Sequence, residues 1–107
     1  MCLVPWIRMM VRALRRAGLQ HNDFVFGMRD TGRMTADRVL ALIAQLPEGV
    51  SEIYFHPAAR KSPENSWPAD YACDEELEAL TSPVVAAALR ASGVHRISFS
   101  DLAAERA

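Results

Sequence analysis

A chain of 107 residues with 50% hydrophobic residues is long enough for one globular domain and too apolar to be intrinsically disordered. Its 12 basic and 13 acidic residues leave a formal charge of −1, which gives no electrostatic reason to expect a nucleic-acid partner. No apolar run approaches the roughly 20 residues of a membrane-spanning helix, and the opening residues lack the pattern of a signal peptide.

The first predicted element is an amphipathic helix over residues 6–17. Trp6, Met10 and Leu14 recur at helical spacing, while four arginines occupy the other side. The arginine face is either a solvated surface or a weak contact for an anionic membrane. The arginines are Arg8, Arg12, Arg15 and Arg16.

Two short strands are predicted over residues 22–26 and 51–55, because both runs are rich in β-branched or aromatic residues and are bounded by turn residues. A helix over residues 36–46 separates them. The second strand ends at His56, because the proline that follows cannot donate to a sheet ladder.

Residues 57–73 show neither helical nor strand periodicity, and a loop of this length is usually functional or disordered. Its two aromatic residues, Trp67 and Tyr71, argue against disorder. Four further elements are predicted: helices over 74–80 and 83–92, a strand over 94–99, and a helix over 102–107. Ser100 and Asp101 are expected to cap the last helix.

Strands that alternate with helices imply an α/β fold with three parallel strands joined by right-handed crossovers. Three such strands make an incomplete sheet, because parallel sheets usually have both faces covered and their edges paired or hidden. A closed (β/α)8 barrel takes about 250 residues. We therefore expect residues 1–107 to form one partial α/β domain: either a small open sandwich or part of a larger barrel.

Two cysteines, Cys2 and Cys73, stand far apart and outside any metal-binding spacing. This usage is typical of a reducing compartment, so we expect two free thiols and a cytoplasmic protein. A Cys2–Cys73 disulfide is the alternative.

Three segments in the order FGMRDTGRMT, LPEGVSEIYFHPA and DEELEALTSPVVAAALRASGVHRISFSDL resemble the C-terminal part of the YdjC-like carbohydrate deacetylases. The resemblance runs from about Trp6 to Leu102 and is strongest to the hopanoid-biosynthesis branch, HpnK. It implies part of a distorted TIM-like barrel. It also implies metal-dependent removal of acetyl from an N-acetyl amino sugar, for example an N-acetylglucosaminyl hopanoid.

The family's metal ligands belong to its N-terminal half, which begins with an N-A-D-D-F-G-type motif. Asn22-Asp23-Phe24 lacks the doubled aspartate and the glycine of that motif. The resemblance therefore implies a divalent metal, Mg or Zn, in the complete enzyme, and no tight binding of metal by this chain alone. It further implies an N-acetylated sugar or glycolipid substrate, and an N-terminal half or a second copy as partner.

His56 matches the family's C-terminal histidine and stands at the carboxyl end of a strand, where parallel α/β proteins place their chemistry. Its imidazole can protonate a leaving amine or hydrogen-bond an oxyanion; a purely structural histidine is the alternative. Substrate contacts are predicted at Asp30, Arg60, Trp67 and Tyr71. Asp30 is alternatively a solvated loop residue, and the two aromatics either meet a sugar or lipid or pin the loop to the body.

Without metal ligands, we expect the isolated chain not to deacetylate. The alternative function is a non-catalytic α/β module that self-associates or docks on a partner through exposed sheet edges, motivated by the shortage of strands.

Overall fold

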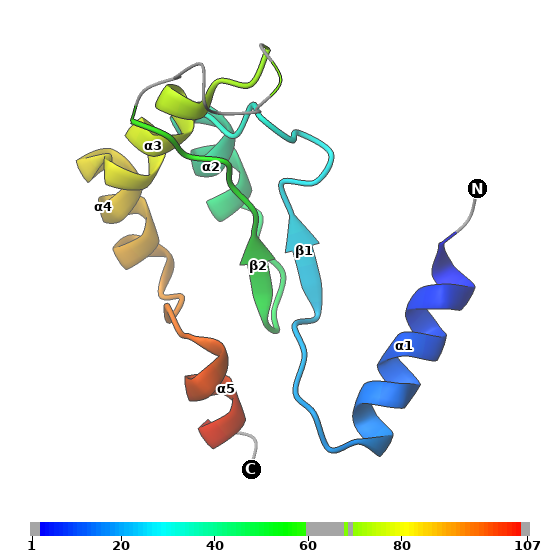
Figure 1. The fold of residues 1–107 in the computed structure, drawn as a ribbon. Helices are drawn as coiled ribbons and strands as arrows, with labels where there is room; N and C mark the ends of the chain where they lie inside the picture. The colour runs from blue at the N-terminus through cyan, green and yellow to red at the C-terminus, as the bar shows by residue number, and fades with distance from the viewer. Residues whose placement is uncertain (1–2, 60–67, 69, 106–107) are drawn as a thin grey trace. The chain divides into compact units, whose positions relative to one another are not determined.

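The computed structural model describes residues 3–59, 68 and 70–105, and the chain divides into two compact units (Figure 1). One unit, formed by Met1–Asn22 and His95–Ala107, contains the helices α1 (Val4–Arg16) and α5 (Phe99–Glu105). The other unit, Asp23–Val94, contains both described strands and the three remaining helices.

The two strands, β1 (Phe24–Phe26) and β2 (Ser51–Ile53), pair in parallel with Val25 opposite Glu52. The helix α2 (Ala36–Ile43) connects them, as a parallel pair requires. Beyond the ladder, the Tyr54 N–H donates to the Phe26 carbonyl oxygen at 2.8 Å. The loops after β1 and after β2 therefore both leave the sheet at the carboxyl ends of the strands.

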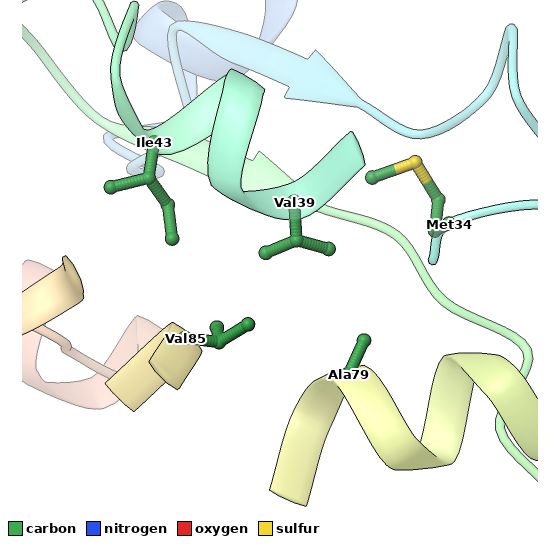
Figure 2. Packing of buried hydrophobic residues seen from close by; sticks show 5 residues of the cluster. All are labelled: Met34, Val39, Ile43, Ala79 and Val85. Carbon is green, nitrogen blue, oxygen red and sulfur yellow. The ribbon is translucent and has the colours of Figure 1, made fainter. Parts of the chain in front are cut away.

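Three helices pack together beside the strands: α2, α3 (Cys73–Thr81) and α4 (Pro83–Ser92). Ser82 is the N-cap of α4, and its hydroxyl accepts a hydrogen bond from the Val85 N–H at 3.4 Å. The core lies where the three helices meet, and Ile53 and Phe55 pack against it from β2 and its extension. Its buried members are Met34, Val39, Ile43, Ala79 and Val85 (Figure 2).

The α/β class and the parallel pairing are confirmed, and every predicted helix is present with shifted ends. The helix predicted over 36–46 ends at Ile43, and the two strands are shorter than predicted, three residues each. The ladder between them ends at the pair Phe26 and Ile53, before the residues that lead into His56.

The predicted third strand over residues 94–99 is wrong. Residues 94–98 have no regular structure and Phe99 begins α5. The Asp101 carboxylate accepts a hydrogen bond from the Ser98 N–H at 2.9 Å, and the Ser98 hydroxyl accepts one from the Asp101 N–H at 3.1 Å. This reciprocal pair caps the helix at Ser98 rather than at Ser100, and local bonds of this kind compete with a sheet ladder.

The cap predicts a pH dependence in α5. The Ser98 N–H, and then its hydroxyl, lower the pKa of Asp101 below its ordinary value of 3.8. The hydrogen bonds from Ser98 to the Asp101 carboxylate therefore stabilise α5 fully above pH 3.8, and this stabilisation is lost as the pH falls through the lowered pKa of Asp101. The Ser98 amide resonance in NMR should report a midpoint below 3.8, and Ser98→Ala should raise it. A midpoint at the ordinary value in the wild type would contradict the cap.

α1 has the two faces predicted for residues 6–17, although it begins earlier, at Val4. Five of its large apolar side chains are exposed in the structure. These are Val4, Trp6, Ile7, Met9 and Met10. None of the helices in the described residues combines the length and apolar character needed to cross a bilayer.

Candidate functional site

His56 lies just beyond the carboxyl end of β2 and is buried, with 7% of its surface exposed. Its backbone N–H donates to Glu76 Oε1 at 2.8 Å, and Glu76 lies in the first turn of α3. The end of the strand is therefore tied, across the long loop, to a residue of α3 that lies 20 positions later in the chain.

Two tyrosine rings flank the imidazole of His56. The ring centroids of Tyr54 and His56 are 4.6 Å apart with an interplanar angle of 80°, and those of Tyr71 and His56 are 5.1 Å apart at 65°. Both are edge-to-face contacts, the arrangement that aromatic rings prefer. The imidazole is thus oriented by one neighbour from the segment that follows β2 and one from the end of the long loop.

Backbone hydrogen bonds join three loops around this histidine. The Ala72 N–H donates to the Gly32 carbonyl at 2.7 Å, and the Ala58 N–H donates to the Cys73 carbonyl at 3.1 Å. The loop after β1, the loop after β2 and the segment leading into α3 are therefore fastened together. Cys73 is a buried free thiol, and Cys2 lies outside the described residues.

Gly32 is the point at which the first loop meets Tyr71. Its φ is +77°, and a Cβ there would lie 2.6 Å from Cδ1 and from Cγ of the Tyr71 ring. Only glycine lets the ring approach the loop this closely while the backbone is left-handed.

Gly32→Ala should therefore displace the Tyr71 ring and destabilise the fold by about 2 kcal/mol, from left-handed strain and overpacking together. Urea unfolding gives the stability, and the His56 ring resonances in NMR report the displacement. Gly93→Ala is the matched control, because Gly93 has a φ of +76° and open space around it. Unchanged His56 resonances in folded Gly32→Ala would show that Tyr71 does not orient the imidazole.

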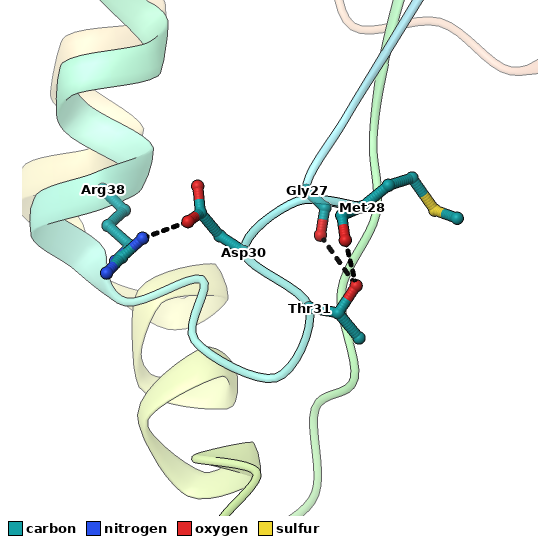
Figure 3. A network of polar contacts seen from close by, with 5 residues as sticks. All are labelled: Gly27, Met28, Asp30, Thr31 and Arg38. Atoms are coloured by element: carbon teal, nitrogen blue, oxygen red, sulfur yellow. Dashed lines mark hydrogen bonds and ion pairs between the residues drawn. The ribbon is translucent and has the colours of Figure 1, made fainter. Parts of the chain in front are cut away.

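Asp30 lies on the loop after β1, as predicted, but its carboxylate is paired with Arg38 of α2 (Figure 3). The same loop is closed by the Thr31 hydroxyl, which donates to the carbonyls of Gly27 and Met28. Asp30 and Arg38 line a cavity of about 560 Å³ between β1, this loop and α2, and neither His56 nor Tyr71 lines it. The structure thus brings Tyr71 to His56, whereas Asp30 lies with Arg38 in the lining of a separate cavity.

Arg60 and Trp67, the other two predicted substrate contacts, lie outside the described residues. Sequence reasoning missed Glu76 as a neighbour of the histidine and Gly32 as a neighbour of Tyr71. The interval of three residues places Cys73, Glu76 and Ala79 on one face of a helix, but only the structure shows that this face is buried.

The described residues do not by themselves fit a divalent metal. Within them, no three His, Cys, Asp or Glu side chains gather as ligands. Glu76, the acid bonded to His56, directs one oxygen to a backbone N–H rather than to the imidazole. A metal bound near His56 would need ligands beyond this set.

A protein-family model described as YdjC-like protein matches residues 2–91. The matched range includes both strands, His56, Tyr71 and Glu76. Comparisons with curated proteins and with solved structures found no match. Because the matched range covers most of the 107 residues, the chain belongs to the YdjC-like family.

Proposed function

We propose that this chain supplies the C-terminal part of a cytoplasmic, metal-dependent deacetylase that removes acetyl from an N-acetyl amino sugar, for example an N-acetylglucosaminyl hopanoid. The observation that carries the proposal is a buried histidine, oriented by two tyrosines, at the carboxyl end of a parallel strand in a YdjC-like chain. Parallel α/β proteins place their catalytic groups at the carboxyl ends of the strands.

The role proposed for His56 needs only an imidazole. Amide hydrolysis leaves an amine that must be protonated, and a positioned histidine can give that proton or hydrogen-bond the developing oxyanion. Tyr71 is the substrate contact that the geometry supports best, because its ring lies against His56. The proposed contacts of Arg60 and Trp67 come from the same long loop.

The exposed sheet supports the idea that the rest of a TIM-like barrel packs here. Phe24 and Val25 of β1 are 40% and 49% exposed, although parallel sheets normally have both faces covered. Among the described residues each strand is paired along one edge only. We propose that the strands and metal ligands of the N-terminal half, or a second copy of the chain, complete the site.

A chimera tests this function. Residues 2–91 replace the corresponding segment of an active YdjC-like deacetylase, and acetate release from an N-acetylglucosamine conjugate is measured with Mg²⁺ or Zn²⁺. We expect the chimera to release acetate and the isolated chain to release none at stoichiometric metal. A folded chimera without activity, or strong deacetylation by the isolated chain, would refute the proposal.

The alternative is a non-catalytic module that docks through its sheet edges, and the unpaired outer edge of each described strand also favours it. Sedimentation of the chain, alone and with the N-terminal half of the same deacetylase, separates the two. Self-association with no affinity for that half, and no acetate release by the assembly with Mg²⁺ or Zn²⁺, supports the module. A monomer that binds the half supports the enzyme.

A further inference from the structure

Glu76 is the most completely buried charged side chain described, with 0% of its surface exposed. Acidic residues are almost never fully buried unless a partner compensates for their lost hydration. Within the described residues, Glu76 Oε1 accepts the His56 N–H at 2.8 Å, and Glu76 Oε2 has no hydrogen-bond partner. An apolar residue would suit this helix face better, since its neighbours on it are Cys73 and Ala79.

We propose that Glu76 is a positioning residue for His56: its buried carboxyl group holds the backbone from which the imidazole projects. This inference rests on the proposed function of His56.

The hydrogen bond acts where the sheet ladder has just ended. The last inter-strand bond is donated by the Tyr54 N–H, and Pro57 has no N–H to donate. The bond from the His56 N–H to Glu76 therefore replaces the sheet partner that this residue has lost. This bond fixes the peptide plane before His56, and it requires only an acceptor oxygen at the position of Glu76 Oε1.

Fixing that plane sets the direction of the side chain. Tyr54 and Tyr71 then restrict the ring from two sides. If the carboxylate is removed, the backbone at His56 is free to rotate while both tyrosines remain. A role in general stability alone would not require the imidazole to move once the protein has folded.

The test compares three variants of the full chain by NMR. Glu76→Gln keeps an oxygen that can accept the His56 N–H, and Glu76→Leu has similar volume but no acceptor. Glu75→Gln is the control, because Glu75 is exposed on the same turn of α3. The readouts are hydrogen exchange of the His56 amide and the imidazole resonances.

We expect Glu76→Gln and Glu75→Gln to resemble the wild type. Glu76→Leu should exchange the His56 amide about tenfold faster and shift its imidazole resonances. Unchanged resonances and exchange in folded Glu76→Leu would overturn the proposal. If Glu76→Leu does not fold, displaced His56 signals in Glu76→Gln, or rapid exchange of the amide in the wild type, would also overturn it.

Activity of the chimera separates this inference from the proposed function. If both the positioning role of Glu76 and the deacetylase function hold, Glu76→Leu lowers the kcat of the chimera with little change in KM, and Glu76→Gln keeps the kcat of the parent chimera. If the NMR results hold but the parent chimera is inactive, Glu76 still positions His56 and only the deacetylase function fails.

Discussion

Replacing His56 by asparagine in the chimera should lower kcat for acetate release by about 100-fold or more, with a smaller effect on KM. A positioned general acid contributes about 10²–10⁴-fold to such a reaction. Asparagine can still donate a hydrogen bond to an oxyanion but cannot give up a proton to the leaving amine. Steady-state kinetics on the wild-type and His56→Asn chimeras measure the effect.

The control for this substitution is His21→Asn. His21 lies within the matched segment and its Nδ1 is 2.7 Å from the carbonyl oxygen of the adjacent residue, Asn22. The His21→Asn substitution should leave the kcat of the chimera unchanged. A His56→Asn chimera that retains its kcat would show that proton transfer does not depend on His56. If His56→Ala then abolishes activity while His56→Asn retains it, the role of His56 is a hydrogen bond to the oxyanion.

Gly27→Ala should destabilise the protein by about 3 kcal/mol or more. Gly27 ends β1 with a φ of +97°, and a Cβ there would lie 2.4 Å from the Tyr54 carbonyl oxygen and 3.2 Å from the Tyr54 nitrogen. The strain of a left-handed backbone costs about 1–2 kcal/mol, and the clash with backbone adds about 1–3 kcal/mol because main-chain atoms cannot rotate aside.

Gly93→Ala isolates the first of these costs. Gly93 ends α4 at a φ of +76° with nothing within 4 Å of the added carbon, so about 1 kcal/mol is expected. Urea unfolding of both variants gives the difference. Equal losses in the two variants would mean that Tyr54 does not approach Gly27 as closely as the structure shows.

The local parts of the fold were predictable because short-range signals determine them. The alternation of strand and helix placed β1, α2 and β2, and the Ser82-Pro83 pair gave the start of α4. Residues 94–99 misled because their apolar residues suggest a strand. The Ser98–Asp101 pair, a helix-capping signal in the same segment, satisfies the backbone locally.

The candidate site was only partly predictable because its contacts are not local. The strand period already placed Tyr54 and His56 on one face, and they are in contact. Tyr71 reaches His56 across the long loop, which no periodicity encodes. Asp74, Glu75 and Glu76 together are typical of the N-terminus of a helix, so the sequence does not single out Glu76. Its burial depends on how α3 packs against the end of β2.

The most direct test of the role of His56 is a crystal structure of the chimera with a bound N-acetylglucosamine conjugate. An imidazole nitrogen of His56 is expected within about 2.6–3.2 Å of the acetamide nitrogen or oxygen, the range needed for proton transfer or hydrogen bonding. A substrate bound with the Tyr71 ring between it and the imidazole would contradict a catalytic role for His56.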